Sequence, residues 1–141
     1  MKVTLKNVKI HKDMSRETDC FSATIYLDGR LVGAVRNEGS GGPNFYDWND
    51  HDAGRRIAAW AKERDPSVQY EHTDLVIAEL LDEYSANQQL LRWCRKATCF
   101  RLAGDAAGNW RTVKAPYSPA VKRFLVDKYG DKIERIANET L

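Results

Sequence analysis

Apolar and polar residues alternate from residue 20 to residue 37, and this two-residue period predicts a β-hairpin. The chain reads CFSATIYL, then Asp28-Gly29, then RLVGAVRN. An Asp-Gly pair supplies the positive φ angles that a two-residue hairpin turn needs. When the two strands are paired residue by residue outward from this turn, their apolar residues fall on one face of the hairpin, which is expected to cover a core. The residues of this face are Phe21, Ala23, Ile25, Val32 and Ala34.

Three further stretches have the pattern of strands. Residues 2 to 10 change their apolar phase near Asn7, which predicts an edge strand with a bulge, and their lysines suit an exposed edge. Residues 98 to 102 and 110 to 113 alternate again around a glycine-containing loop, which predicts a second hairpin.

A period of three to four residues predicts the helices. One begins at Asp50 or Asp52 and ends near Arg64, before Pro66, and another begins at Thr73. Ser85 is a second capping candidate, so two alternatives remain: the helix that begins at Thr73 continues past Ser85, or a separate helix covers residues 86 to 96. Near the C-terminus, Ser118-Pro119 is a helix start, Gly130 a stop, and Asp131 with Glu134 resembles a capping box that restarts a helix.

Strands and helices come in runs rather than in strict alternation, and this order favours an α+β fold over a wound parallel sheet. We expect an antiparallel sheet built from an N-terminal three-stranded meander and the later hairpin, packed with four or five short helices. The 141 residues are within the usual size of one domain, so residues 1–141 are expected to form a single domain around one core.

Charge is spread unevenly along the chain, although the net charge is only +2. Residues 66 to 90 carry five acidic side chains and no Lys or Arg, whereas residues 91 to 141 carry eleven basic and five acidic ones. Such a division affects which partners are attracted rather than the fold. No apolar run approaches the length of a membrane span and the N-terminus lacks a signal-like apolar centre, so a cytoplasmic location without membrane contact is expected.

The three cysteines and three histidines lack the spacing of a metal site or a redox pair. Reduced thiols are expected at Cys20, Cys94 and Cys99. No cofactor motif is present, so the prediction is a protein without metal or cofactor.

Residues 38 to 44 contain more glycine than a simple exit from a strand requires, and three aromatic residues follow closely. Glycine lets a backbone approach a ligand, but the loop contains no lysine and matches no phosphate-binding motif. It remains a candidate small-molecule site. Its candidate residues are Gly39, Gly41, Gly42, Asn44, Tyr46 and Trp48.

A small enzyme would have to use the cluster around His51, where Asp47, Asp50 and Asp52 surround one imidazole. A carboxylate can orient an imidazole for general-base catalysis. Acids just before a helix are more often caps, and no nucleophile motif accompanies them, so no residue is assigned a catalytic role.

A resemblance rests on Glu17-Thr18, Cys20-Phe21, Ala23, Tyr26, Asp28-Gly29, Gly33, Asn37, Gly39 and Gly41-Gly42. Through these residues, the segment 17 to 42 resembles a family of small uncharacterised proteins of bacterial, plasmid and phage genomes. The resemblance implies no activity. It implies a setting in which small proteins often act by binding, including phage proteins that block host defence.

These observations favour a non-catalytic protein-binding module, for example a phage inhibitor of a host defence or nucleic-acid-processing system. A host protein is the expected partner, and the acidic stretch would attract a basic surface by imitating phosphate charge. The candidate residues are Glu71, Asp74, Glu79, Asp82 and Glu83.

Nucleic acid is the alternative partner, because basic and aromatic residues are mixed between residues 92 and 128. Basic groups hold phosphates and aromatic rings stack on bases. The candidate residues are Arg92, Arg95, Lys96, Arg101, Arg111, Lys114, Lys122 and Arg123. The sequence leaves the oligomeric state open.

Overall fold

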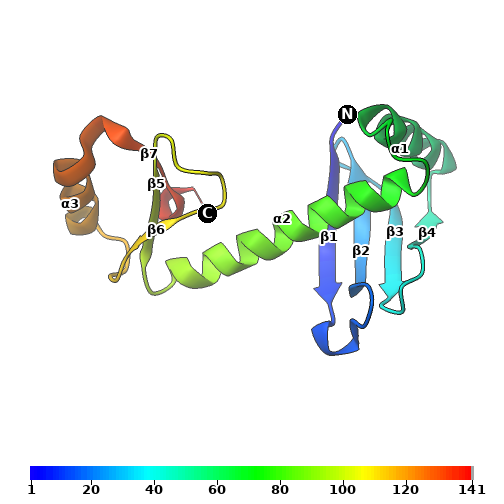
Figure 1. The fold of residues 1–141 in the computed structure, drawn as a ribbon, viewed down its shortest axis with the longest axis horizontal. Helices are drawn as coiled ribbons and strands as arrows, with labels where there is room; N and C mark the ends of the chain where they lie inside the picture. The colour runs from blue at the N-terminus through cyan, green and yellow to red at the C-terminus, as the bar shows by residue number, and fades with distance from the viewer. Residues whose placement is uncertain (141) are drawn as a thin grey trace. The chain divides into compact units, whose positions relative to one another are not determined.

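The computed structural model describes residues 1–140, and the chain divides into an N-terminal unit, Met1–Asp82, and a C-terminal unit that begins at Glu83 (Figure 1). The boundary lies inside helix α2 (His72–Cys94), which therefore contributes its first half to one unit and its second half to the other. Each unit combines an antiparallel sheet with helices, so the α+β class is confirmed. The strands form two sheets rather than the single sheet that was predicted.

The sheet of the N-terminal unit has the order β1-β2-β3-β4, with β1 at Val3–Ile10, β2 at Cys20–Leu27, β3 at Arg30–Glu38 and β4 at Phe45–Trp48. The predicted turn is confirmed, because Asp28 and Gly29 have φ angles of 50° and 85° between paired Leu27 and Arg30. The edge strand β1 breaks register beside Asn7, whose φ is 52°. Strand β4 was not predicted.

The predicted buried face of the hairpin is right for β2 and partly wrong for β3. Ile25 pairs with Gly33 and Tyr26 with Leu31, so Val32 is an extra residue in β3. This β-bulge reverses the alternation that follows it. Val35 is therefore buried in place of Ala34, which is only half-buried.

Two helices cover one face of this sheet. Helix α1 (His51–Arg64) begins at Asp50, whose carboxylate accepts a hydrogen bond from the N–H of Ala53. Ile57 of α1 and Ile77 and Leu81 of α2 pack on apolar residues of β1, β2 and β3. Among residues 1–140, no helix has the length and apolar character needed to cross a membrane.

Of the two alternatives at Ser85, the continuous helix is right and the separate helix over residues 86 to 96 is wrong. Ser85 lies inside the continuous helix α2, because no Gly or Pro interrupts the chain between Thr73 and Cys94. A capping residue starts a helix only where the preceding backbone leaves the helical conformation.

The sheet of the C-terminal unit has the order β6-β5-β7, with β5 at Thr98–Leu102, β6 at Arg111–Val113 and β7 at Ile133–Ile136. One face packs on helix α3 (Pro119–Tyr129) through Leu125, and the other contributes Cys99 to a cluster with Leu90 of α2. The helix start at Ser118 is confirmed, as is the stop at Gly130.

The predicted helix after Gly130 is wrong, because residues Ile133–Ile136 form strand β7. Pairing with β5 gives these residues backbone partners that a short isolated helix would lack. The described residues therefore contain three α-helices and several short 3-10 turns, fewer than the four or five helices expected.

Each unit has its own cluster of buried side chains, around Ile25 and Ile57 in the N-terminal unit and around Leu125 in the C-terminal unit. The expected single core is thus replaced by separate ones. That residues 1–141 behave as one domain stays a prediction about how the two units unfold.

Candidate functional site

The glycine loop, residues 38 to 44, is held together by the buried side chain of Asn37. The Asn37 Oδ1 accepts hydrogen bonds from the Gly39 N–H and from the hydroxyl of Thr18, both at 2.8 Å. Its Nδ2 donates to the Gly42 carbonyl and to Asn44 Oδ1, both at 3.0 Å. One carboxamide therefore satisfies both ends of the loop, as buried polar groups require.

The glycines of this loop allow it to pack closely on residues 14 to 19. Gly39 has a φ of 87°, and a Cβ built on it would be 2.6 Å from the carbonyl oxygen of Met14. A Cβ on Gly41 would collide with the carboxylate of Glu17. The Gly41 N–H already bonds to Thr18. Close contact between two loops thus accounts for Gly39 and Gly41, whereas a Cβ on Gly42 would meet open space.

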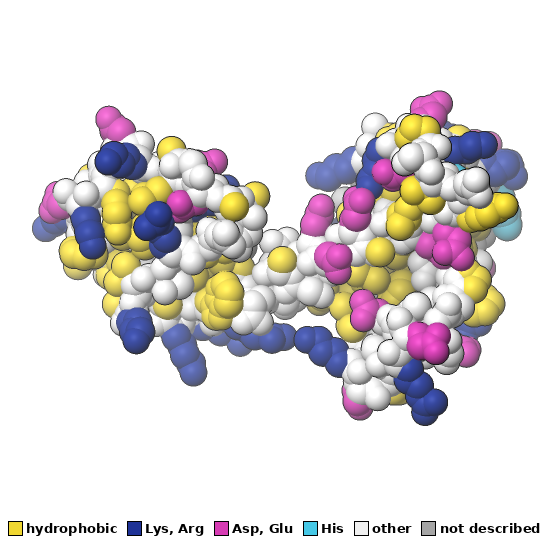
Figure 2. All heavy atoms as spheres, viewed as in Figure 1, with side chains coloured by type: hydrophobic (Ala, Val, Ile, Leu, Met, Phe, Trp, Pro, Cys, Tyr) yellow, Lys and Arg dark blue, Asp and Glu magenta, His cyan; other side chains and the backbone are white. Residues whose placement is uncertain are grey.

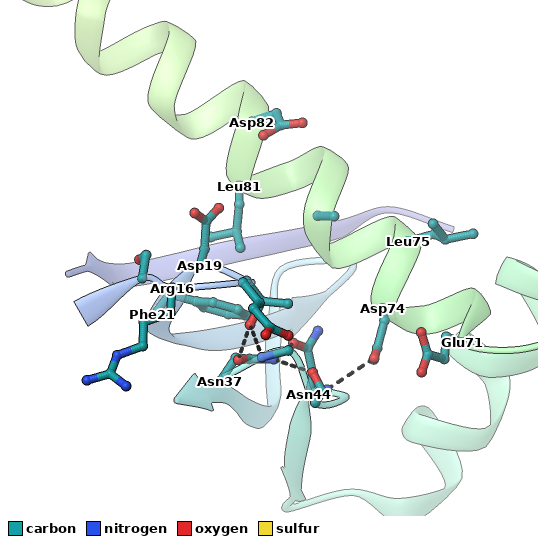
Figure 3. Close-up of a pocket in the computed structure, with 16 residues that line it drawn as sticks. Arg16, Asp19, Phe21, Asn37, Asn44, Glu71, Asp74, Leu75, Leu81 and Asp82 are labelled. Carbon is teal, nitrogen blue, oxygen red and sulfur yellow. Dashed lines mark hydrogen bonds between the residues drawn. The ribbon is translucent and has the colours of Figure 1, made fainter. Parts of the chain in front are cut away.

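Beside this loop lies the acidic groove, a cavity of about 540 Å³ between residues 15 to 19, the end of the glycine loop and the first turns of α2 (Figure 3). Its apolar lining comes from Phe21, Leu75, Ala78 and Leu81. Its carboxylates belong to Glu17, Asp19, Glu71, Asp74 and Asp82, and its one basic side chain is Arg16. Figure 2 shows acidic side chains gathered on a face of the N-terminal unit.

Asp74 differs from the other groove carboxylates because it binds within the protein. It accepts hydrogen bonds from the Tyr46 hydroxyl at 2.5 Å and from the Asn44 N–H at 3.1 Å. Burial, together with the nearby Asp74 carboxylate, raises the pKa of the Tyr46 hydroxyl above its usual value. Asp74 therefore fastens β4 and the glycine loop to the start of α2.

The other four groove carboxylates, those of Glu17, Asp19, Glu71 and Asp82, form no ion pair with a residue between 1 and 140. Carboxylates elsewhere in the unit do find cations, as in the pairs Arg30–Asp50 and Arg64–Glu79. The groove thus concentrates negative charge that the described part of the chain leaves uncompensated.

The predicted acidic residues are only partly brought together. Glu71, Asp74 and Asp82 line the groove, Glu79 is bound to Arg64, and Glu83 belongs to the C-terminal unit. The sequence analysis proposed no site residue among residues 15 to 19, which supply part of the groove lining. The signal was the pair Gly39 and Gly41, since positive φ and close approach imply a neighbouring segment.

Trp48, a candidate loop-site residue, is part of the protein's internal packing. Its indole lies between Gly33 and Gly54, where an added Cβ would be 2.8 Å from ring atoms in both cases. It also stacks on Tyr46 with ring centroids 5.4 Å apart. Of the candidate loop residues, Gly41, Gly42 and Asn44 line the groove.

Two of the three acids around His51, Asp50 and Asp52, have structural partners in the N-terminal unit. Asp50 caps α1 and pairs with Arg30 at 2.9 Å, and these bonds lower the pKa of its carboxyl. Asp52 pairs with Arg55. Asp47 is exposed on β4, and no hydrogen bond joins it to the His51 ring in residues 1–140. The arrangement is that of a helix cap.

The predicted basic residues fall into two groups. Arg101, Arg111 and Lys122 bind carboxylates of Glu134, Asp105 and Glu139. The Arg111 guanidinium and the Leu102 N–H together lower the pKa of Asp105 to about 2. The exposed residues without a carboxylate partner among residues 1–140 are Arg92, Arg95, Lys96, Lys114 and Arg123.

The cysteines Cys20, Cys94 and Cys99 form no disulfide. Burial and the neighbouring Cys94 raise the pKa of the Cys99 thiol to about 12, which makes it a poor nucleophile. Within residues 1–140, no three His, Cys, Asp or Glu side chains are grouped closely enough to hold a metal ion.

No protein-family model matches the chain, and no curated protein or solved structure matches it either. Function must therefore be inferred from the residues themselves and from their geometry.

Proposed function

We propose that the protein is a non-catalytic binding module whose acidic groove docks a basic segment of a partner protein. The observation that supports this most directly is the set of four carboxylates without ion-pair partners around an apolar lining.

The groove combines the two features that a lysine or arginine side chain needs. The aliphatic stems of such residues pack on apolar surface while their charged ends stay near anions. Leu75, Ala78 and Leu81 supply the apolar surface along α2, and Asp19 and Asp82 supply anions at its margin (Figure 3). A volume of about 540 Å³ accommodates several side chains of an extended segment.

The partner class follows from charge. An acidic surface speeds association with a basic protein and disfavours acidic ones. Proteins that bind or process nucleic acid present basic surfaces, so they are the class we propose. The resemblance of residues 17 to 42 to proteins of phages and plasmids is compatible with an inhibitor of a host defence or nucleic-acid-processing system.

A photo-cross-linking amino acid placed in the groove tests this proposal in a bacterial lysate. Ala78 is an exposed groove residue of α2, and Ala58 is an exposed residue of α1 outside the groove. We expect a discrete product at Ala78 and not at Ala58, with a cross-linked protein whose contacting peptide is rich in Lys and Arg. Identical products at both positions, or an acidic contacting peptide, would contradict the proposal.

Charge variants then separate groove binding from general attraction. The double change Asp19→Asn and Asp82→Asn should weaken binding of the captured partner by roughly fivefold, because an exposed ion pair contributes about 0.5 kcal/mol and two contribute about 1 kcal/mol. The matched control, Asp13→Asn with Asp47→Asn, removes two exposed charges outside the groove and should change the affinity little. Equal effects of the groove and control variants would point to nonspecific electrostatics.

A further inference from the structure

A pocket of about 350 Å³ lies in the C-terminal unit, between the second half of α2 and the face of the sheet that carries Cys99. Two indoles, two guanidinium groups and two carboxamides line it, those of Trp93, Trp110, Arg101, Arg135, Asn87 and Gln89. No Asp or Glu is among its lining residues. We call it the Trp-Arg pocket, and it is independent of the acidic groove.

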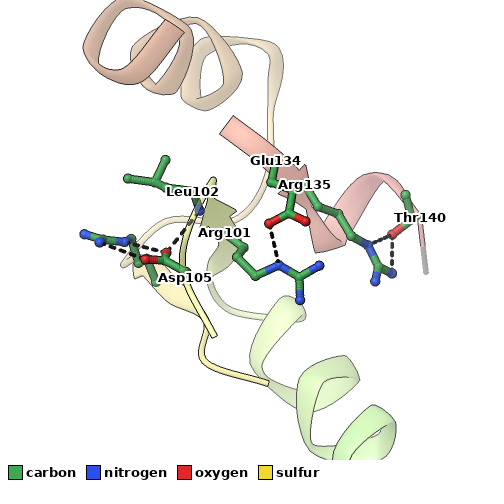
Figure 4. A network of polar contacts seen from close by, with 7 residues as sticks. Arg101, Leu102, Asp105, Glu134, Arg135 and Thr140 are labelled. Carbon is green, nitrogen blue, oxygen red and sulfur yellow. Dashed lines mark hydrogen bonds and ion pairs between the residues drawn. The ribbon is translucent and has the colours of Figure 1, made fainter. Parts of the chain in front are cut away.

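The two arginines of this pocket lie directly opposite each other and share one stabilising contact, the ring of Trp110. Arg101 of β5 and Arg135 of β7 are direct partners in the antiparallel ladder, so their side chains leave the same face of the sheet (Figure 4). Their guanidinium carbons lie 5.0 and 5.5 Å from the ring centroid of Trp110. Like charges directly opposite one another on neighbouring strands destabilise the pair.

The protein compensates only part of this charge. The Arg101 Nε lies 3.3 Å from a Glu134 oxygen, but that nitrogen is buried and makes no hydrogen bond. Arg135 donates from Nε and Nη2 to the hydroxyl of Thr140, at 2.9 and 2.7 Å, which is a neutral partner (Figure 4). Within residues 1–140, only one of the two guanidinium groups therefore has a carboxylate partner, and an anion between them would relieve the repulsion.

Trp93 provides a different feature at the same pocket. Its side chain is 45% exposed, and no aromatic ring or cation within residues 1–140 stacks on it. Gln89 lies one helical turn before it on α2, so a carboxamide is near the ring. An exposed indole beside hydrogen-bonding groups is a surface on which a planar heterocycle can stack.

We propose that the Trp-Arg pocket binds a nucleotide unit, with the phosphate between Arg101 and Arg135 and the base stacked on Trp93. Guanidinium groups bind phosphate oxygens through paired hydrogen bonds. Stacking on an aromatic side chain holds any base because every base has a π-face. The volume is near the lower end of known ligand sites, which fits one nucleotide rather than a dinucleotide.

The source of the nucleotide is either a free mononucleotide or a single strand, and three titrations distinguish them. The four tryptophan indole N–H signals of the ¹⁵N-labelled full chain are followed with adenosine monophosphate, with inorganic phosphate and with a short oligothymidine. We expect the signals of Trp93 and Trp110 to move, and those of Trp48 and Trp60 to stay, with the mononucleotide or the oligonucleotide. A strand ligand would bind more tightly than the mononucleotide and weaken steeply with salt.

Variants separate the two halves of the pocket. Trp93→Ala should weaken nucleotide binding roughly tenfold and leave phosphate binding unchanged, whereas Trp93→Phe should restore stacking. Arg135→Gln should weaken both, and the nucleotide should raise the unfolding temperature of the wild type but not of this variant. Leu91→Ala, an exposed change on the same helix outside the pocket, is the control.

Two results would overturn the proposal. One is the absence of any movement of the Trp93 and Trp110 signals with both nucleotide probes at millimolar concentration. The other is nucleotide binding that Trp93→Ala weakens no more than Leu91→Ala does.

Discussion

The indole of Trp48 fills space that Gly33 and Gly54 leave open. This contact predicts that Gly54→Ala destabilises the wild-type protein but stabilises a variant in which a smaller side chain replaces Trp48. An added Cβ on Gly54 of α1 would be 2.8 Å from two ring atoms of Trp48, and one on Gly33 of β3 would be equally close to the ring. Neither glycine has a positive φ. The indole therefore requires glycine at position 54, whereas at position 33 the indole acts together with the backbone carbonyl oxygen of Asp47, which would also be 2.8 Å from the added Cβ.

The change Gly54→Ala sets two effects against each other. Replacing Gly with Ala inside a helix stabilises it by about 1 kcal/mol. Inserting a methyl group into a well-packed site costs about 1 to 3 kcal/mol. At a separation of 2.8 Å the ring must move, so we expect a net loss of about 1 kcal/mol in the free energy of unfolding.

Removing the ring should reverse the outcome. In a Trp48→Leu background the new methyl group meets a smaller side chain, and only the helix-propensity gain remains. Gly54→Ala should then stabilise by up to about 1 kcal/mol, which corresponds to a coupling energy of about 2 kcal/mol between the two positions. Such a coupling is within the range measured for residues in contact.

Urea unfolding followed by circular dichroism measures all four proteins of this cycle without depending on tryptophan fluorescence. Ala58→Gly, at an exposed position of α1, reports the propensity effect alone and should cost about 1 kcal/mol. A stabilising effect of Gly54→Ala in the wild type, or the same effect in both backgrounds, would refute the packing argument.

Three further predictions concern the glycine loop, acid stability and the two units. Gly39→Ala should lower the free energy of unfolding by about 1 to 3 kcal/mol, because Gly39 has a positive φ and an added Cβ would collide with the Met14 carbonyl oxygen. The control Gly42→Ala places its Cβ in open space and should change the free energy of unfolding by less than about 0.5 kcal/mol. Urea unfolding measures both variants. The pKa of Asp105 is about 2 in the folded protein and about 3.9 in the unfolded chain, so its contribution to the free energy of unfolding is complete above pH 4 and is lost as the pH falls towards 2. Asp105→Asn should therefore flatten the dependence of the free energy of unfolding on pH between pH 4 and pH 2. An unchanged slope would contradict the pairing with Arg111. One calorimetric transition is expected if residues 1–141 form a single domain, and two separate transitions would exclude it.

Features that depend on a few neighbouring residues were predicted from the sequence. The Asp28-Gly29 turn, the start at Ser118 and the stop at Gly130 were located correctly, and the cap was narrowed to two residues, Asp50 and Asp52, of which Asp50 is the cap. Each is decided by local backbone preference and by a hydrogen bond within a few residues. The phase change at Asn7 was equally visible, since it interrupts the alternation of its own strand.

Features that need a distant partner were missed or misassigned. Residues Ile133–Ile136 form strand β7 because their backbone pairs with strand β5, although the capping pattern of Asp131 and Glu134 predicted a helix. The bulge at Val32 appears only in the pairing of β2 with β3. A strand has no hydrogen bonds of its own, so tertiary context overrides its local propensity.

In the acidic groove and in the Trp-Arg pocket, too, the sequence determines some features and only the tertiary structure determines others. Sequence analysis identified the acidic stretch of α2 and the arginines of the C-terminal half, since charge can be counted along the chain. Only the tertiary structure placed residues 15 to 19 against α2 to form the acidic groove. Likewise, only the register of β5 and β7 set Arg101 opposite Arg135, because cross-strand neighbours are determined by pairing and not by their separation in sequence.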